Sequence, residues 1–189
     1  MTKRWPWWLV VAGGLVMASL WPLYISLHGP TSFDLEGRFL GRGTLFWGAM
    51  MEGPPSLLIA AGLLALLPGI WVAFGRPGRM GYVLVLVSLV IPGVVDLVIV
   101  AIVPPLLYPV EAAGFALLAI AGRRLHPLTR MVFGVMAALL AATFLLELLL
   151  SREQFDAMEA YRIHGLLAHV VAGIGWAVAG VTEALRPRG

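Results

Sequence analysis

Residues 80–103 read MGYVLVLVSLVIPGVVDLVIVAIV and contain a single charged residue, Asp96. A helix that crosses a lipid bilayer needs about 20 consecutive, mostly apolar residues, so this stretch is long enough for one crossing. The same character extends over the whole chain of 189 residues, of which 60% are hydrophobic and 12% are charged. Ordinary soluble domains have about 25% charged residues. The composition therefore predicts a membrane protein and argues against a soluble enzyme, a disordered segment or a nucleic-acid-binding domain.

Five further segments have the length and apolar character of membrane spans. We expect a single all-α domain over residues 1–189, a bundle of six transmembrane helices at about residues 7–28, 55–75, 80–103, 106–122, 128–150 and 163–185. Pro104 and Pro105 are expected to form a tight turn between the third and fourth helices. Residues 29–54 are expected to form a partly helical extracytoplasmic segment. Pro54 and Pro55 suit the first turn of the second helix, where a missing N–H costs little.

Basic residues predict the orientation of these spans. With the N-terminus in the cytoplasm, nine basic residues lie on the cytoplasmic side: Lys3, Arg4, Arg76, Arg79, Arg123, Arg124, Arg130, Arg186 and Arg188. Only four lie outside: Arg38, Arg42, Arg152 and Arg162. Cytoplasmic loops carry an excess of Lys and Arg, so we expect both termini in the cytoplasm. A single Lys among the basic residues is typical of a GC-rich bacterial genome, which points to a bacterial inner membrane.

Ionisable side chains inside a bilayer cost several kcal/mol and by default mark functional sites. Three acids are noted within the predicted spans: Asp96, Glu111 and Glu147. Four more ionisable residues lie near span ends: His28, Glu52, His164 and His169. At about 1.5 Å of helix rise per residue, all seven fall in the outer half of the membrane. We expect no buried charge in the inner half.

Helical spacing places several of these groups on common faces. Ser88, Pro92 and Asp96 follow one another at intervals of four residues, and Tyr108 precedes Glu111 by three, so each set shares one side of its helix. Asp96 and Glu111 lie at similar depth on neighbouring antiparallel helices. Their carboxylates repel unless one is protonated or a cation bridges them. These patterns predict a polar cavity that opens to the outside and is closed below by an apolar plug.

One tyrosine and two histidines extend this candidate site. Tyr24 shares a face of the first helix with His28, while His169 is flanked at intervals of four by Gly165 and Gly173. Small residues let helices approach closely, which favours a protein-facing His169. An alternative interpretation is that tyrosines at helix ends belong to the aromatic belt at a membrane surface. The same position is expected for three tryptophans: Trp5, Trp7 and Trp8.

The leading hypothesis is that this cavity binds or transports a small ligand, a cation or a proton through Asp96, Glu111, Glu147 and Glu52. A second hypothesis is a redox or metal-dependent membrane enzyme. Haem would need His28 paired with His164 or His169, and zinc would use these histidines with Asp96. The chain has no cysteine, which removes disulfides and thiolate sites. No sequence signature of a catalytic site supports the enzyme.

A third hypothesis is an accessory subunit, because the glycine-rich helix faces suit packing against a second copy or a partner in a membrane complex. The lipid bilayer is the one partner that the composition implies. Enzymatic activity, catalytic residues, cofactor and substrate are not determined by the sequence.

Overall fold

The computed structural model describes residues 4–28, 38–99, 107–149 and 169–187. Within these ranges the chain forms six α-helices: α1 (Trp5–His28), α2 (Thr44–Ala73), α3 (Arg76–Ile99), α4 (Tyr108–Ala121), α5 (Pro127–Leu149) and α7 (Ala172–Leu185). A π-helical turn at residues 169–171 leads into α7. A short antiparallel hairpin of β1 (Arg38–Phe39) and β2 (Arg42–Gly43) precedes α2. The predicted all-helical class is confirmed.

Four helices are long and apolar enough to cross a membrane. The qualifying segments are Trp5–Leu27, Phe46–Ala73, Arg76–Val98 and Pro127–Leu145. The helices α4 and α7 are also apolar but have only 14 residues each. The predicted turn at Pro104 and Pro105, and the beginning of the predicted sixth span, lie outside the described residues. The chain is therefore a helical protein of membrane character, as its composition predicted.

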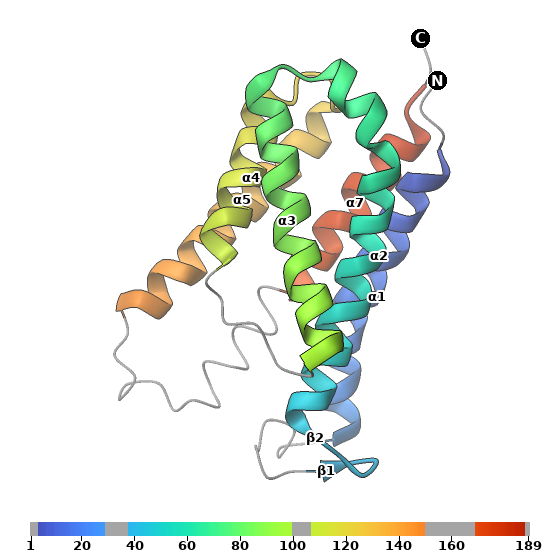
Figure 1. Ribbon diagram of the computed structural model, residues 1–189, viewed down its shortest axis with the longest axis vertical. Helices are drawn as coiled ribbons and strands as arrows, with labels where there is room; N and C mark the ends of the chain where they lie inside the picture. Colours follow the sequence, from blue (N-terminus) through green and yellow to red (C-terminus); the bar gives the residue numbers. More distant parts are fainter. Residues whose placement is uncertain (1–3, 29–37, 100–106, 150–168, 188–189) are drawn as a thin grey trace.

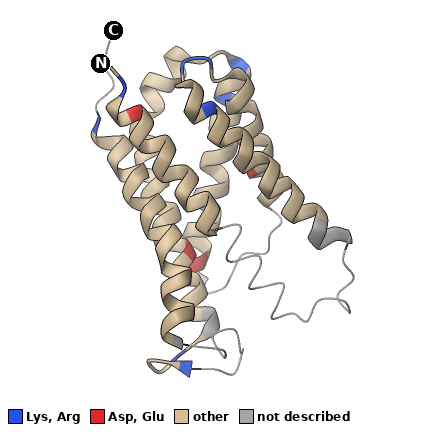
Figure 2. Cartoon of the chain, turned by 180° about the vertical axis from the view of Figure 1, so that it is seen from behind, with Lys and Arg blue, Asp and Glu red and all other residues tan. Residues whose placement is uncertain are grey.

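The helices form a ring in which each packs against the next along the chain, and α7 closes the ring between α5 and α1 (Figure 1). Both termini lie at the same end of the ring as the α2–α3 and α4–α5 turns, and we call this the termini end. The opposite end carries β1 and β2, and we call it the hairpin end. Basic residues gather at both ends and leave the helices between them nearly free of charge (Figure 2).

Glycines let the helices of the ring approach closely. A Cβ atom on Gly14 of α1 would lie 2.6 Å from the carbonyl oxygen of Gly173 in α7. On α2, a Cβ atom on Gly53 would lie 3.2 Å from the carbonyl oxygen of Gly93 in α3. Packing between small residues is the usual basis of helix association in membranes. These contacts fix α1 against α7 and α2 against α3.

The second helix begins at Thr44, so the prediction that Pro54 and Pro55 open it is wrong. Both prolines lie inside a continuous helix of 30 residues. Interior proline is tolerated where tertiary packing compensates for the lost backbone hydrogen bonds. That packing is visible in the first turns of α2, where Met51 is buried and the indole N–H of Trp47 donates to the carbonyl oxygen of Phe39 at 2.9 Å. Residues 44–54 of the predicted extracytoplasmic segment are thus part of α2.

Four aromatic rings cover the hairpin end of α1 and α2, and we call them the aromatic cap: Trp21, Tyr24, Phe39 and Trp47. Tyr24 lies edge-on to Trp21 at 6.3 Å and edge-on to Phe39 at 5.9 Å between ring centroids. The hairpin turns at Gly41, whose φ of 76° favours glycine. Tyr24 is buried in this cluster. Its ring therefore packs against protein and does not face the membrane surface as a residue of an aromatic belt would. Similarly, Trp7 is buried in the core, whereas Trp5 and Trp8 are exposed.

The centre of the ring is apolar toward the termini end. Phe115 of α4, Phe133 of α5 and Trp176 of α7 meet there with ring centroids 5.2–5.5 Å apart. All three side chains are buried. Edge-to-face and offset ring contacts add stabilisation beyond burial alone. The three rings therefore belong to one buried apolar cluster at this end of the ring.

One buried acid contradicts the expectation that the termini half of the bundle holds no buried charge. Glu183 lies within the predicted sixth span, and its side chain is only 6% exposed. Its carboxylate accepts a hydrogen bond from the backbone N–H of His126 at 2.6 Å and lies 3.8 Å from Arg186. Arg186 in turn donates to the carbonyl oxygen of Arg124. Buried charge is tolerated because the acid is both paired and hydrogen-bonded, and the result is a clamp that fastens the α4–α5 turn to α7.

Candidate ligand-binding cavity

A cavity lies inside the helix ring, and every one of the six helices contributes to its wall. The space inside it that water-sized molecules can occupy is about 70 Å³, and one side is open. The lining residues are Met17 of α1, Glu52 and Ser56 of α2, Ser88, Leu89 and Pro92 of α3, Leu107 just before α4, Tyr108 and Glu111 of α4, Leu140 of α5, His169 of the π-helical turn and Ala172 of α7. Ligand pockets in proteins combine apolar walls with a few polar groups, and this lining has that character.

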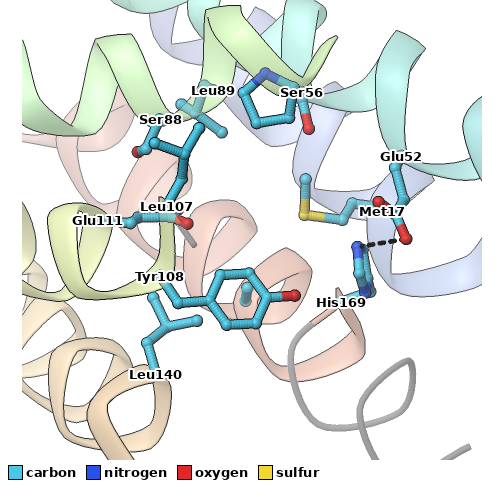
Figure 3. A pocket seen from close by; sticks show the side chains of 12 residues that line it. Met17, Glu52, Ser56, Ser88, Leu89, Leu107, Tyr108, Glu111, Leu140 and His169 are labelled. Atoms are coloured by element: carbon cyan, nitrogen blue, oxygen red, sulfur yellow. Dashed lines mark ion pairs between the residues drawn. The ribbon is translucent and has the colours of Figure 1, made fainter. Parts of the chain in front are cut away.

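One wall of the cavity holds an acid and an imidazole in contact. The Nε2 atom of His169 lies 3.4 Å from Oε1 of Glu52, with side chains 12% and 16% exposed (Figure 3). The ring of Trp21 from the aromatic cap lies 5.9 Å from the imidazole ring. Met17 fills the space beside the pair. The aromatic ring and the acid therefore hold His169 from two sides.

The facing wall is built from the first turn of α4. Figure 3 shows the Glu111 carboxylate pointing into the cavity and the ring of Tyr108 extending across it with its hydroxyl toward His169. An acid in the first turn of a helix is favoured by the helix dipole, which explains the position of Glu111. No hydrogen bond or ion pair joins the Glu111 carboxylate to another residue in the described part of the chain.

The α3 side of the cavity is formed by part of the helix face on which Ser88, Pro92 and Asp96 were predicted to lie. Ser88 and Pro92 both line the cavity. The Ser88 hydroxyl donates to the carbonyl oxygen of Val85 at 2.9 Å, and its own carbonyl lacks the usual helix partner because Pro92 has no N–H. Asp96, one turn further along, is fully buried but is not among the lining residues. It lies instead against Gly53 of α2.

The structure therefore brings together four of the predicted site residues: Glu52, Glu111, Tyr108 and His169. Asp96 and Tyr24 pack elsewhere in the same half of the ring. The predicted convergence of Asp96 and Glu111 is replaced by Glu111 facing the pair of Glu52 and His169. The side chains of His28 and Glu147, and the whole of His164, lie outside the described part of the structure.

The sequence reasoning missed six lining residues: Met17, Ser56, Leu89, Leu107, Leu140 and Ala172. Ser56 follows Glu52 by four residues, so the two share one face once α2 is continuous through its prolines. The incorrect start of the second helix concealed this pattern. Met17 carries no comparable signal, because an apolar residue in an apolar span gives no indication of which way it faces.

The described residues contain no group of three or more His, Asp or Glu side chains arranged to hold a metal ion. Of the histidines proposed as haem or metal ligands, only His169 has a described side chain, and it contacts Glu52. The fourth histidine, His126, lies in the α4–α5 turn at the termini end. The described geometry gives no support to the haem or zinc hypothesis.

Comparisons with protein-family models, with curated proteins and with solved structures found no match to this chain. Its class is accordingly defined by its own features. It is a helical protein with four helices apolar enough to cross a membrane and with a partly polar cavity inside its helix ring.

Proposed function

We propose that the chain is a six-span protein of a bacterial inner membrane with both termini in the cytoplasm. Four helices have the required length. The two shorter ones, α4 and α7, are each preceded by further mostly apolar sequence at residues 101–107 and 163–171. Seven of the nine described arginines belong to the termini end: Arg4, Arg76, Arg79, Arg123, Arg124, Arg130 and Arg186. The excess of positive charge on cytoplasmic segments supports this orientation.

The function that the geometry supports best is the binding of a small ligand, a cation or a proton in the central cavity, either for transport or for sensing. One observation carries the proposal: the Glu111 carboxylate points into a cavity whose opposite wall is the Glu52–His169 pair. An ionisable group inside a membrane protein is costly and is retained for a function. The cavity lies toward the hairpin end, which faces outward in the proposed orientation.

The absence of cysteine from the chain makes this proposal directly testable. A Ser88→Cys variant would place one thiol in the cavity wall. We expect a cationic methanethiosulfonate reagent to modify this thiol about tenfold faster than an anionic one, because a carboxylate-lined cavity concentrates cations. Each rate is divided by the rate of the same reagent with a free thiol in solution. The preference should fall toward one when Glu111→Gln is added.

A matched control is Leu40→Cys, at the exposed tip of the hairpin beside Arg42. It should react readily with both reagents and show no preference for the cationic one. The proposal fails if the Ser88→Cys thiol is modified only after unfolding, or if it is modified in the folded protein without charge preference.

A further inference from the structure

We propose that the ligand of the central cavity is a small organic ammonium ion with one positive charge and an apolar body. This inference rests on the proposed function and names the chemical class that the cavity accepts. It follows from the charges on the two walls, from the number of oxygen atoms near Glu111 and from the aliphatic side chains between the walls.

The charges on the walls select against anions and for a single positive charge. Of the described lining residues, only His169 is able to carry a positive charge, and it is already engaged with Glu52 at 3.4 Å. The Glu111 carboxylate has no ion-pair partner in the described structure. A carboxylate in apolar surroundings is costly until a proton or a counter-charge neutralises it. One monovalent cation opposite Glu111 meets that requirement.

The donor set around Glu111 is unsuited to a metal ion. Hard cations such as Ca²⁺ take six to eight oxygen ligands. The side chains nearest to Glu111 along the wall include Leu107 and Leu89, which offer none. Tyr108 and Ser88 supply single hydroxyl oxygens, and the Ser88 carbonyl without a helix partner adds one more, which still falls short of six. The described chain contains no cluster of acids and histidines suited to a metal. An ammonium group needs fewer contacts, because one carboxylate and the face of one aromatic ring hold it well.

Tyr108 is placed to supply the aromatic contact. It precedes Glu111 by three residues in α4, so both side chains leave the same face of the helix, and Figure 3 shows its ring spanning the cavity beside the carboxylate. The remaining wall is aliphatic: Met17, Leu89, Leu107, Leu140 and Ala172. These side chains offer nothing to a hydrated inorganic ion but bury the hydrocarbon part of an amine.

The test uses the full-length Ser88→Cys protein in detergent and a small neutral reagent, methyl methanethiosulfonate, whose rate is insensitive to charge. Benzyltrimethylammonium and benzylamine are the cationic probes, and benzenesulfonate is the anionic probe of similar size. NaCl and CaCl₂ represent metal ions at matched ionic strength. Both amines should slow modification by about tenfold when present at about ten times the dissociation constant, because only unoccupied cavities react.

A second acid provides the matched control. Glu111→Gln should abolish protection by the amines, whereas Glu183→Gln, at the far end of the ring, should retain it. The inference is overturned if neither amine protects, if benzenesulfonate protects equally, or if Na⁺ or Ca²⁺ protects in their place. These outcomes leave an accessible, charge-selective cavity standing. A thiol that no reagent modifies in the folded protein removes the proposed function itself.

Discussion

The Nε2 atom of His169 and the Oε1 atom of Glu52 lie 3.4 Å apart, and their contact joins two helices that are not adjacent in the ring. In the ring, α1 lies between α2 and α7 and packs against both. The pair therefore bridges the ring across one side of the cavity. Glu111, on the facing wall of the cavity, has no such contact among the described residues.

The bridge predicts an energetic coupling between the two side chains. In a double-mutant cycle of Glu52→Gln and His169→Gln, we expect a coupling free energy of about 1 kcal/mol, the scale of polar contacts between membrane helices. The measurement is the free energy of unfolding in mixed micelles with increasing dodecyl sulfate. A cycle of Glu111→Gln with His169→Gln serves as the control and should be nearly additive. Additivity in the first cycle as well would contradict the bridge.

The close approach of α1 and α7 predicts that Gly173 accepts no side chain. A Cβ atom there would lie 2.5 Å from the backbone nitrogen of Ala18 and 2.6 Å from the carbonyl oxygen of Gly14. Backbone atoms cannot move aside as a flexible side chain does, so Gly173→Ala should reduce the free energy of unfolding by about 1–3 kcal/mol.

Gly134 of α5 is the matched control for this substitution. The nearest atom to a Cβ at Gly134 is the Cβ of Ala119 at 3.8 Å, which is ordinary contact. Gly134→Ala should therefore leave the stability unchanged or raise it slightly. Equal losses at the two positions would show that the α1–α7 interface is not where the structure places it.

The clamp at the termini end predicts that Glu183 protects the α4–α5 turn. Glu183→Ala leaves the backbone N–H of His126 without its acceptor, at a cost of about 1–3 kcal/mol. We therefore expect trypsin to cleave the variant faster after Arg123 and Arg124. The cleavage rate is measured by mass spectrometry of the fragments. Glu183→Gln keeps an acceptor oxygen and should cleave at nearly the wild-type rate. Identical cleavage of the alanine and glutamine variants would mean that the hydrogen bond does not hold the turn.

The proposed orientation predicts opposite labelling of two exposed positions. Leu40, at the hairpin tip, is 77% exposed, and Arg123 is exposed in the α4–α5 turn. In intact cells, a membrane-impermeant maleimide should label Leu40→Cys, while Arg123→Cys should be labelled only after the membrane is opened. Labelling of both thiols in intact cells, or the reverse pattern, would exclude the proposed topology.

The sequence predicted the helical class because apolar composition over about 20 residues leaves few alternatives in a membrane. It also predicted the stripe of Ser88 and Pro92 and the shared face of Tyr108 and Glu111, since helical spacing is a local property. It failed at Pro54 and Pro55. Local rules place proline at a helix start, whereas burial of Met51 and the hydrogen bond from Trp47 carry α2 back to Thr44.

The sequence by itself determined that this protein is helical, apolar enough for a membrane and poor in interior charge, because composition and periodicity act along one segment at a time. Tertiary structure alone decided which acids share a cavity. Glu52 faces Glu111 while Asp96 turns against Gly53, and this outcome depends on the rotation of each helix about its axis. That rotation is set by contacts between helices, such as those of Gly53, Gly93 and Gly173, and no single helix contains the information that fixes it.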